Sequence, residues 1–275
     1  MGKFFLSFWL TCFASLPMVW AQLENPAMGG RAKGIANASV AVRDHWALFN
    51  NIGGLAGIKK YTGQIAYNNR FGIANFQTFA LGITAPVKVG AAGLSVSRFG
   101  DNLYSEQRIG IGYSHQIKNV SLGGKVNYVQ VSIQDLGSKG TLVFEFGGIA
   151  RLSKEVLFGA HIYNFNQGVF NTALGEEEKL PVIMKAGISY QPLSALMINA
   201  ETEKNIDLPA TFKVGLEYEI VPQIYVRTGI QTQPMTNYFG VGFQPKRFHL
   251  NYALTTNNLL GISHHLSFTY QLGKK

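Results

Sequence analysis

The sequence predicts an all-β protein, a transmembrane antiparallel β-barrel of about 14 strands with a short N-terminal plug segment. Only 14% of the 275 residues are charged, against about 25% in a typical soluble domain. Hydrophobic residues make up 47%, yet no apolar run beyond residue 21 approaches the roughly 20 residues that a spanning helix needs. From residue 60 onward, apolar and polar residues alternate with the period of two that indicates strands.

Residues 1–21 are predicted to be a signal peptide. Lys3 precedes an apolar stretch over 4–13, and Val19 and Ala21 provide the small residues of a cleavage site. We therefore expect export to the outer membrane of a Gram-negative bacterium. The only cysteine, Cys12, lies in this segment, so the mature chain has no disulfide, thiolate nucleophile or cysteine-bound metal.

The next segment, residues 22–58, shows little period-two alternation and is rich in Gly, Ala and Asn. We expect Asp44 to be the N-cap of a short helix over 44–49. A barrel of about 14 strands has room for a plug in its lumen, so this segment is predicted to fold back inside, held mainly by polar contacts. The barrel is then expected to occupy residues 59–275.

Fourteen strands are predicted, separated by alternating short and long connections, as in outer-membrane barrels with short periplasmic turns and longer outer loops. Aromatic residues gather beside the short turns and predict an interfacial girdle: Tyr113, Tyr190, Tyr218, Phe243, Phe248 and Tyr270. The expected strands are 61–69, 75–86, 88–98, 104–116, 119–133, 140–151, 155–166, 180–191, 195–203, 210–220, 223–232, 236–244, 247–255 and 262–273.

The two faces of these strands differ in chemistry. Over 211–220, Phe212, Val214 and Leu216 alternate with Lys213 and Gly215, which places the apolar set toward lipid and the polar set toward the lumen. Inward Gly215 is expected to tolerate serine. The charges on the inward faces either pair across strands or contact a solute; the lumen-facing candidates are Arg108, Lys125, Glu145, Lys185, Lys213, Glu217 and Arg227.

Motifs for catalysis and cofactor binding are absent from the sequence. There is no P-loop, no Gly-x-Ser-x-Gly elbow and no His-Glu-x-x-His. His264 and His265 are adjacent on a strand and point to opposite faces, so they cannot share a metal. His161 and His249 are inward candidates for a catalytic site, with Ser189 or Glu145 inward elsewhere on the wall. We expect no enzyme, cofactor or metal site. The triplet 176–178 is interpreted as a solvated acidic run in the longest outer loop.

The net charge of +9 comes from Lys and Arg residues that are scattered along the chain. A nucleic-acid-binding protein would cluster them on one face or in one run. We therefore expect no nucleic-acid partner and interpret the basic residues as surface and pore charge.

Three N-terminal stretches, GRAKGIANA (30–38), AVRD (41–44) and ALFNNIGGLA (47–56), resemble the signature of the FadL/TodX family and its PorV/PorQ relatives. That signature runs roughly G-A-R-A-x-G-x-G-x-A, then V-A-x-D, then N-P-A-G-L-A. The matching positions, which form the candidate plug motif, are Asp44, Asn51, Gly54, Leu55 and Ala56. The residues at 52 and 53 depart from the Pro and Ala of the signature. The short chain is closer to the compact PorV/PorQ group.

The resemblance implies a plugged barrel in an outer membrane and leaves two functions open. The FadL branch moves hydrophobic molecules into the cell, which implies passage or binding of a hydrophobic or small solute past the plug. The PorV/PorQ branch serves type IX secretion in Bacteroidetes-type bacteria, which implies an accessory barrel that docks to a translocon or cargo. The expected partners are accordingly outer-membrane lipid and either a hydrophobic small molecule or secretion-system components.

Overall fold

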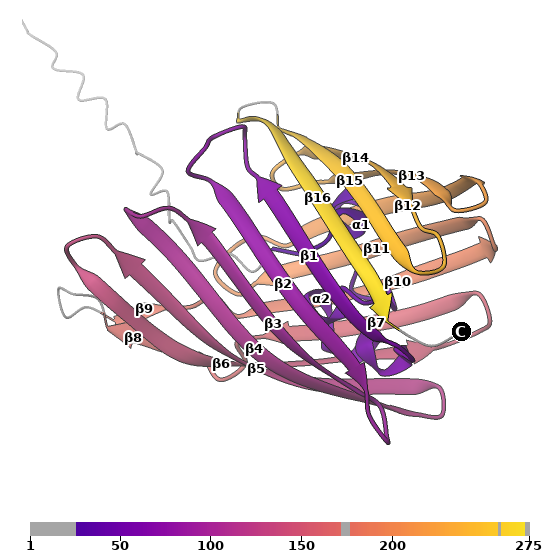
Figure 1. The fold of residues 1–275 in the computed structure, drawn as a ribbon, viewed down its shortest axis with the longest axis horizontal. Coiled ribbons are helices and arrows are strands. Elements are labelled where there is room, and N and C mark those ends of the chain that lie inside the picture. Colours follow the sequence, from indigo (N-terminus) through magenta and orange to yellow (C-terminus); the bar gives the residue numbers. More distant parts are fainter. Residues whose placement is uncertain (1–25, 172–176, 258–259, 273–275) are drawn as a thin grey trace, which may run out of the picture.

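The computed structural model describes residues 26–171, 177–257 and 260–272. Fourteen antiparallel strands form a closed barrel in which β1 pairs with β2 on one side and with β16 on the other. Figure 1 shows the strands as a tilted ring with α1 and α2 inside it. The predicted fold class is confirmed. The predicted signal peptide, residues 1–21, lies outside the described residues.

Every strand of the wall begins and ends within three residues of its predicted span, because the period-two pattern continues along the whole strand. The first half of the wall comprises β1 (Tyr61–Asn69), β2 (Gln77–Pro86), β3 (Ala91–Gly100), β4 (Tyr104–Ile117), β5 (Val120–Ile133), β6 (Gly137–Arg151) and β7 (Val156–Tyr163). The second half comprises β10 (Ile183–Leu193), β11 (Leu196–Asn205), β12 (Thr211–Val221), β13 (Ile224–Gln231), β14 (Thr236–Phe243), β15 (Phe248–Asn257) and β16 (Gly261–Leu272).

The wall is apolar outside and polar inside. On β12, Phe212 and Val214 are 56% and 47% exposed, whereas Lys213 and Glu217 between and beyond them are 4% and 5% exposed. An isolated soluble protein would expose the opposite set, because leaving apolar side chains in water is unfavourable while charged groups favour it. This alternation repeats around the ring and gives the barrel an outer surface suited to lipid.

The two ends of the barrel differ in the length of their connections. Short turns at 87–90, 118–119, 152–155, 194–195, 222–223 and 244–247 form one end, called here the turn end. The other end, called the loop end, has the longest connections, 70–76, 164–182 and 206–210. It also has connections as short as the turns, at 101–103, 134–136 and 232–235, so the expected alternation of short and long connections holds only in part. Tyr61 at the start of β1 lies opposite Leu272 at the end of β16, so the wall begins and ends at the turn end.

The longest predicted outer loop contains secondary structure that the sequence did not indicate. Between β7 and β10 lies a small hairpin, β8 (Val169–Asn171) with β9 (Glu177–Lys179), in which Val169 lies opposite Lys179. Phe170 is 6% exposed and packs in a cluster with Val143 and Tyr163 from the wall. This tertiary contact stabilises the hairpin, which is too short to be indicated by periodicity. Residues 172–176 of the same connection lie outside the described residues.

Before the first strand, residues 26–58 form three short helical elements inside the barrel: α1 (Gly30–Gly34), α2 (Ala47–Asn50) and the 3₁₀ helix η1 (Ile52–Gly57). We call residues 26–58 the plug. The predicted helix over 44–49 is wrong in its start, because α2 begins at Ala47 with Trp46 as N-cap. Asp44 instead accepts a hydrogen bond from the backbone N–H of Trp46 at 2.8 Å, which closes the preceding turn. Within the described ranges, no helix combines the length and apolar character required to cross a membrane.

Candidate functional site

The plug backbone lies directly against the wall where the wall carries glycine. A Cβ built on Gly159 would lie 2.2 Å from the carbonyl oxygen of Val40, and one on Gly215 would lie 2.3 Å from that of Ile35. Real Cβ atoms do not approach other atoms this closely, so these strands hold glycine to admit the plug. The expectation that Gly215 tolerates serine is therefore wrong: the inward space is filled by plug backbone rather than water.

Polar contacts join the plug to strands on several sides of the lumen. The Gly30 N–H donates to Ser267 Oγ at 2.8 Å on β16, and the Val40 N–H donates to Glu201 Oε2 at 2.8 Å on β11. On β4, Ser114 Oγ donates to the Gly53 carbonyl at 3.1 Å. Backbone groups that form no ladder are thus satisfied by wall side chains, as buried backbone requires.

Apolar packing also attaches the plug to the wall, which corrects the expectation of a mainly polar attachment. Leu48, Ile52 and Leu55 are at most 1% exposed and form one cluster with Ala66 of β1 and Ala80 of β2. Each such side chain contributes about 1.5–3 kcal/mol when fully buried. The plug is accordingly a packed part of the fold and not a loosely held segment.

The candidate motif residues lie at the bend between α2 and η1. Asn51 is fully buried; its Nδ2 donates to the Val40 carbonyl at 2.5 Å and to the β6 carbonyl of Gly148 at 3.2 Å, while its Oδ1 accepts from the Gly53 N–H at 3.1 Å. One side chain thus fixes the bend to the wall.

The next motif positions pack closely. A Cβ on Gly54 would lie 2.9 Å from both the Ala47 Cβ and the Val42 carbonyl oxygen. Leu55 is fully buried in the apolar cluster, and Ala56 is half-buried at the end of η1. These residues therefore shape the plug rather than line a binding surface.

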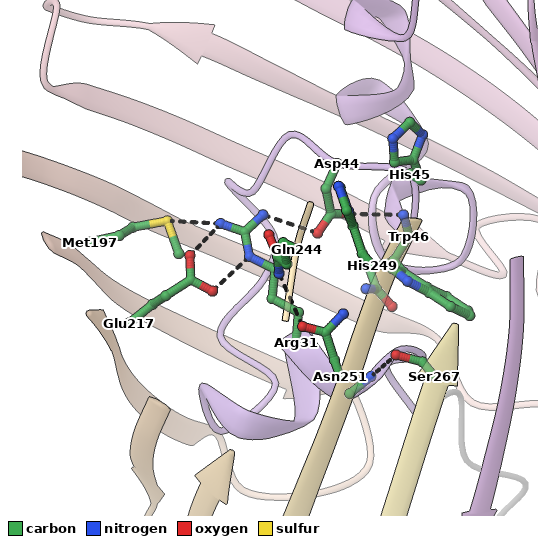
Figure 2. A network of polar contacts seen from close by, with 12 residues as sticks. Arg31, Asp44, His45, Trp46, Met197, Glu217, Gln244, His249, Asn251 and Ser267 are labelled. Atoms are coloured by element: carbon green, nitrogen blue, oxygen red, sulfur yellow. Dashed lines mark hydrogen bonds and ion pairs between the residues drawn. The ribbon is translucent and has the colours of Figure 1, made fainter. Parts of the chain in front are cut away.

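Arg31 of α1 connects the plug to β12 electrostatically (Figure 2). Its guanidinium donates to both carboxylate oxygens of Glu217, at 2.9 Å from Nε and 2.6 Å from Nη2, and its Nη1 lies 3.3 Å from Asp44 Oδ2. Arg227 Nε donates to the same Glu217 at 2.5 Å. Burial disfavours the charged form of Arg31, but the attraction of Glu217 and Asp44 outweighs it and raises the Arg31 pKa. The two hydrogen bonds from Arg31 to Glu217 fix the orientation of the guanidinium and stabilise the contact between plug and wall.

A second charged cluster lies between β10, β11 and β12. Lys213 Nζ lies 3.3 Å from Glu201 Oε1 and 2.7 Å from Glu203 Oε2, and Lys185 Nζ lies 3.2 Å from the same Glu203 oxygen. Because Glu201 also accepts from the plug at Val40, this cluster neutralises wall charge and holds the plug.

The third cluster includes the remaining candidates, on β4, β5 and β6. Glu145 lies 3.7 Å from Lys125 Nζ and 3.1 Å from His161 Nε2, and Arg108 pairs with Glu106 at 3.3 Å. Glu145 was expected to lie elsewhere on the inward faces, but the structure places it beside His161. The seven lumen-facing candidates are therefore brought together in three separate groups and not in one site.

The third cluster lines a cavity of about 430 Å³ at the loop end, which we call the outer pocket. Its apolar lining comes from the plug, from the connection between β1 and β2, and from the loop-end residues of β3 and β4, and includes Met28, Phe49, Phe76, Phe99 and Tyr104. Cationic Arg70, Arg108 and Lys125 and acidic Glu106 and Glu145 complete it. An apolar cavity with a few convergent polar groups is the usual form of a small-molecule site.

A second cavity of about 340 Å³ lies at the turn end and shares no lining residue with the first. We call it the inner vestibule. Plug residues line both cavities, with Phe49 in the outer pocket and Trp46 in the inner vestibule. The plug therefore lies between the two cavities.

Some members of these groups were missed by sequence reasoning although a signal was present. Glu203 and Glu106 have the same strand parity as Glu201 and Arg108, so period two alone places them inside. Arg31 lies in the first of the three N-terminal stretches, GRAKGIANA (30–38), but its partner Glu217 is far away in sequence. The pocket aromatics Phe76 and Phe99 lie at strand ends, where alternation weakens.

Comparison with solved structures gives the same architecture at low sequence identity. The P. putida toluene transporter TodX superposes with a TM-score of 0.70 at 11% identity, covering 92% of this chain and 100% of that one. The Ralstonia pickettii toluene transporter TbuX gives 0.70 at 10% identity, covering 91% and 100%. A Pseudomonas aeruginosa FadL homologue gives 0.66 at 13% identity, covering 90% and 99%.

The chain has the fold of the FadL/TodX-type transport barrels. The neighbours named above are transporters or their homologue, and identity at this level establishes the fold alone. No protein-family model and no curated protein sequence matches the chain.

Proposed function

We propose that this protein is an outer-membrane channel that takes a small hydrophobic solute into the outer pocket, with the plug controlling its passage to the turn end. The observation that carries the proposal is the outer pocket, an open aromatic cavity inside the wall whose floor is the plug. The toluene transporters with the same fold support a hydrophobic solute class. In this proposal, the plug motif residues hold the plug in the position that separates the two cavities, which we call the closed state.

The proposed orientation places the turn end in the periplasm and the loops outside. Supporting it, the turn end has only connections of two to four residues, whereas the longest connection, 164–182, is at the loop end. The aromatic residues beside the short turns lie on the outer face, including Tyr113 at 46% and Tyr218 at 43% exposed. Aromatic side chains at one level mark a membrane interface. Outer-membrane lipid is then the partner of the wall, and no enzymatic step is assigned to the protein.

The outer pocket suits a flat apolar molecule better than a sugar or an ion. Phe49 comes from the plug, Phe76 from the connection between β1 and β2, and Phe99 from β3, so three rings from separate elements contribute to one cavity. Aromatic pairs contribute about 0.5–1.5 kcal/mol beyond the area that they bury. Arg108 and Lys125 add an edge that can hold a polar substituent of the solute.

The experiment is whole-cell uptake of a radiolabelled monoaromatic hydrocarbon, in a bacterium whose lipopolysaccharide layer excludes it and whose own transporter is deleted. The double variant Phe76→Ala/Phe99→Ala should lower the initial rate about tenfold, since about 1.4 kcal/mol of lost contact corresponds to that factor. The control is Phe239→Ala, which removes a ring that is 50% exposed on the outer face and should leave the rate unchanged.

Uptake equal to that of cells without the protein would contradict the proposal. The secretion-accessory hypothesis, which the resemblance of the N-terminal stretches to the PorV/PorQ branch implies, would then be the better one, with its predicted docking to a translocon or cargo. At present the neighbours named above favour transport, because all are transporters or a transporter homologue.

A further inference from the structure

The inner vestibule is lined by several cationic residues to which the transport proposal gives no role. It lies at the turn end, between the plug and strands β14 to β16, and its lining includes Gln244, His249 and Gln271 from the wall side. From the plug and the chain just beyond it come Arg31, Arg43, Asp44, His45, Trp46, Lys59 and Lys60. Four of the described lining residues are cationic and one is acidic.

Asp44, the single acidic residue of the described lining, already has partners. Asp44 Oδ1 accepts from the Trp46 N–H at 2.8 Å, and its Oδ2 lies 3.3 Å from Arg31 Nη1. Arg31 in turn is held by Glu217. The positive charge of Arg43, Lys59 and Lys60 is therefore not balanced by an acid in the lining.

Three plug residues that line the inner vestibule also carry buried hydrogen-bond donors that have no acceptor in the described part of the chain. Three buried ring or guanidinium nitrogens of the plug have no partner among the described residues: Arg43 Nε, His45 Nδ1 and Trp46 Nε1. His45 Nε2 lies 3.2 Å from the Gln271 amide nitrogen and so acts as an acceptor, which leaves the proton of the neutral ring on Nδ1. Trp46 is only 3% exposed. Buried donors without acceptors are costly, and an oxygen-rich ligand supplies acceptors.

We propose that the inner vestibule binds an oxyanion, a carboxylate or phosphate group, at the junction of plug and wall. Arg43, Lys59 and Lys60 supply the charge, and the plug donors supply hydrogen bonds after a small local adjustment. Charge-assisted hydrogen bonds from such groups are stronger than neutral ones. The ligand would contact plug and wall together and so stabilise the closed state.

A metal cation is the other ligand that two nearby imidazoles suggest, and the electrostatics disfavour it. His45 and His249 have ring centroids 6.1 Å apart, but among the described residues no group of three His, Cys, Asp or Glu side chains is placed to hold a metal. Burial lowers the pKa of His45, with Asp44 opposing and Lys60 adding to this shift. Burial and the charge of Arg151 likewise lower the pKa of Arg43. This positive region attracts anions and repels cations.

Tryptophan fluorescence provides the test. In a protein prepared from residue 22 onward, Trp46 is the only tryptophan of the sequence, and it lines the vestibule. The refolded protein in zwitterionic detergent is titrated with inorganic phosphate, with short-chain phosphatidic acid, and with sodium chloride at equal ionic strength. The variant Lys59→Gln/Lys60→Gln removes two exposed charges of the vestibule, and Lys88→Gln/Lys118→Gln removes two exposed charges from other short turns at the same end.

A saturable change of Trp46 emission with phosphate, with phosphatidic acid or with both is the expected result, and the arm that responds distinguishes a free anion from a lipid headgroup. Binding should be at least about tenfold weaker in the vestibule variant and unchanged in the control variant. The proposal is overturned if neither probe gives a saturable change, if sodium chloride gives the same change, or if both variants bind like the unmodified protein.

Discussion

Replacing Gly215 by alanine tests whether the plug rests on the wall as described. The new Cβ would lie 2.3 Å from the Ile35 carbonyl oxygen and 2.6 Å from the Ile35 Cβ, where ordinary contact is 3.4–4 Å. The plug or the strand must therefore shift by about 1 Å, a shift that backbone atoms make less easily than a flexible side chain. Gly63 on β1 provides the matched control, because nothing lies within 4 Å of a Cβ built there.

The size of the effect follows from the two positions together. Both variants gain the same alanine preference of about 0.5–1 kcal/mol over glycine within a strand. Only Gly215→Ala adds overpacking, which typically costs about 1–3 kcal/mol. Ile35 is fully buried with Val42 and Met197, so lifting the plug away from the wall would forfeit contacts of similar value. We expect Gly215→Ala to be about 1–3 kcal/mol less stable than Gly63→Ala.

The assay is equilibrium urea unfolding of both variants in lipid vesicles, followed by Trp46 fluorescence and by gel mobility without boiling. Equal free energies of unfolding for the two variants would refute the contact between β12 and the plug. A second comparison isolates the cause: in a chain lacking residues 22–58, the difference between the two variants, followed by gel mobility, should disappear. A difference that persists there would place the strain within the wall.

Four further outcomes are expected. Val214→Arg, on the outer face, should destabilise the barrel by about 2–4 kcal/mol in the same unfolding assay. Asn51→Leu should cost about 1–3 kcal/mol, because buried carbonyls lose their donor, and should make the plug more sensitive to protease. The pKa of His45 is lowered from its ordinary value of 6.5, so below pH 6.5 the unfolded chain binds more protons than the folded one. Plug stability should therefore fall as the pH drops through 6.5, and His45→Gln should weaken that dependence. Deleting residues 22–58 should leave a folded barrel with higher conductance in planar bilayers, and unchanged conductance would show that strands and loops alone close the lumen.

The wall could be predicted from the sequence because one rule governs all of it. A strand between lipid and lumen must alternate, so Phe212 and Val214 can only lie outside if Lys213 lies inside. The hairpin of β8 and β9 could not be predicted, because it depends on Phe170 reaching a cluster of residues from other strands. The start of α2 was missed for a similar reason: Asp44 has a second partner, Arg31, that local capping rules do not consider.

The site was harder to predict than the fold. An inward glycine such as Gly159 is equally consistent with a water-filled lumen and with a plug, and only the position of the Val40 backbone distinguishes them. The alternation along each strand predicts which charged residues face the lumen. It does not predict which of them lie close together, because that depends on how neighbouring strands are aligned. The outer pocket combines Phe49 with Phe99, which are far apart in sequence and share no pattern.

The position of α1 also bears on how the barrel assembles. Closing the wall requires the first and last strands to meet, and the entropic cost of closing a loop grows with its length. Because α1 rests on β14, β15 and β16, with the Gly30 N–H bonded to Ser267, the chain leading into β1 is held beside its partner strand β16. Once this contact has formed, β1 is linked to the edge of β16 by the short segment between α1 and β1 instead of by the whole wall. The shorter link raises the effective concentration of β1 at β16. The plug therefore fills the lumen and also holds the first and last strands of the wall close to each other.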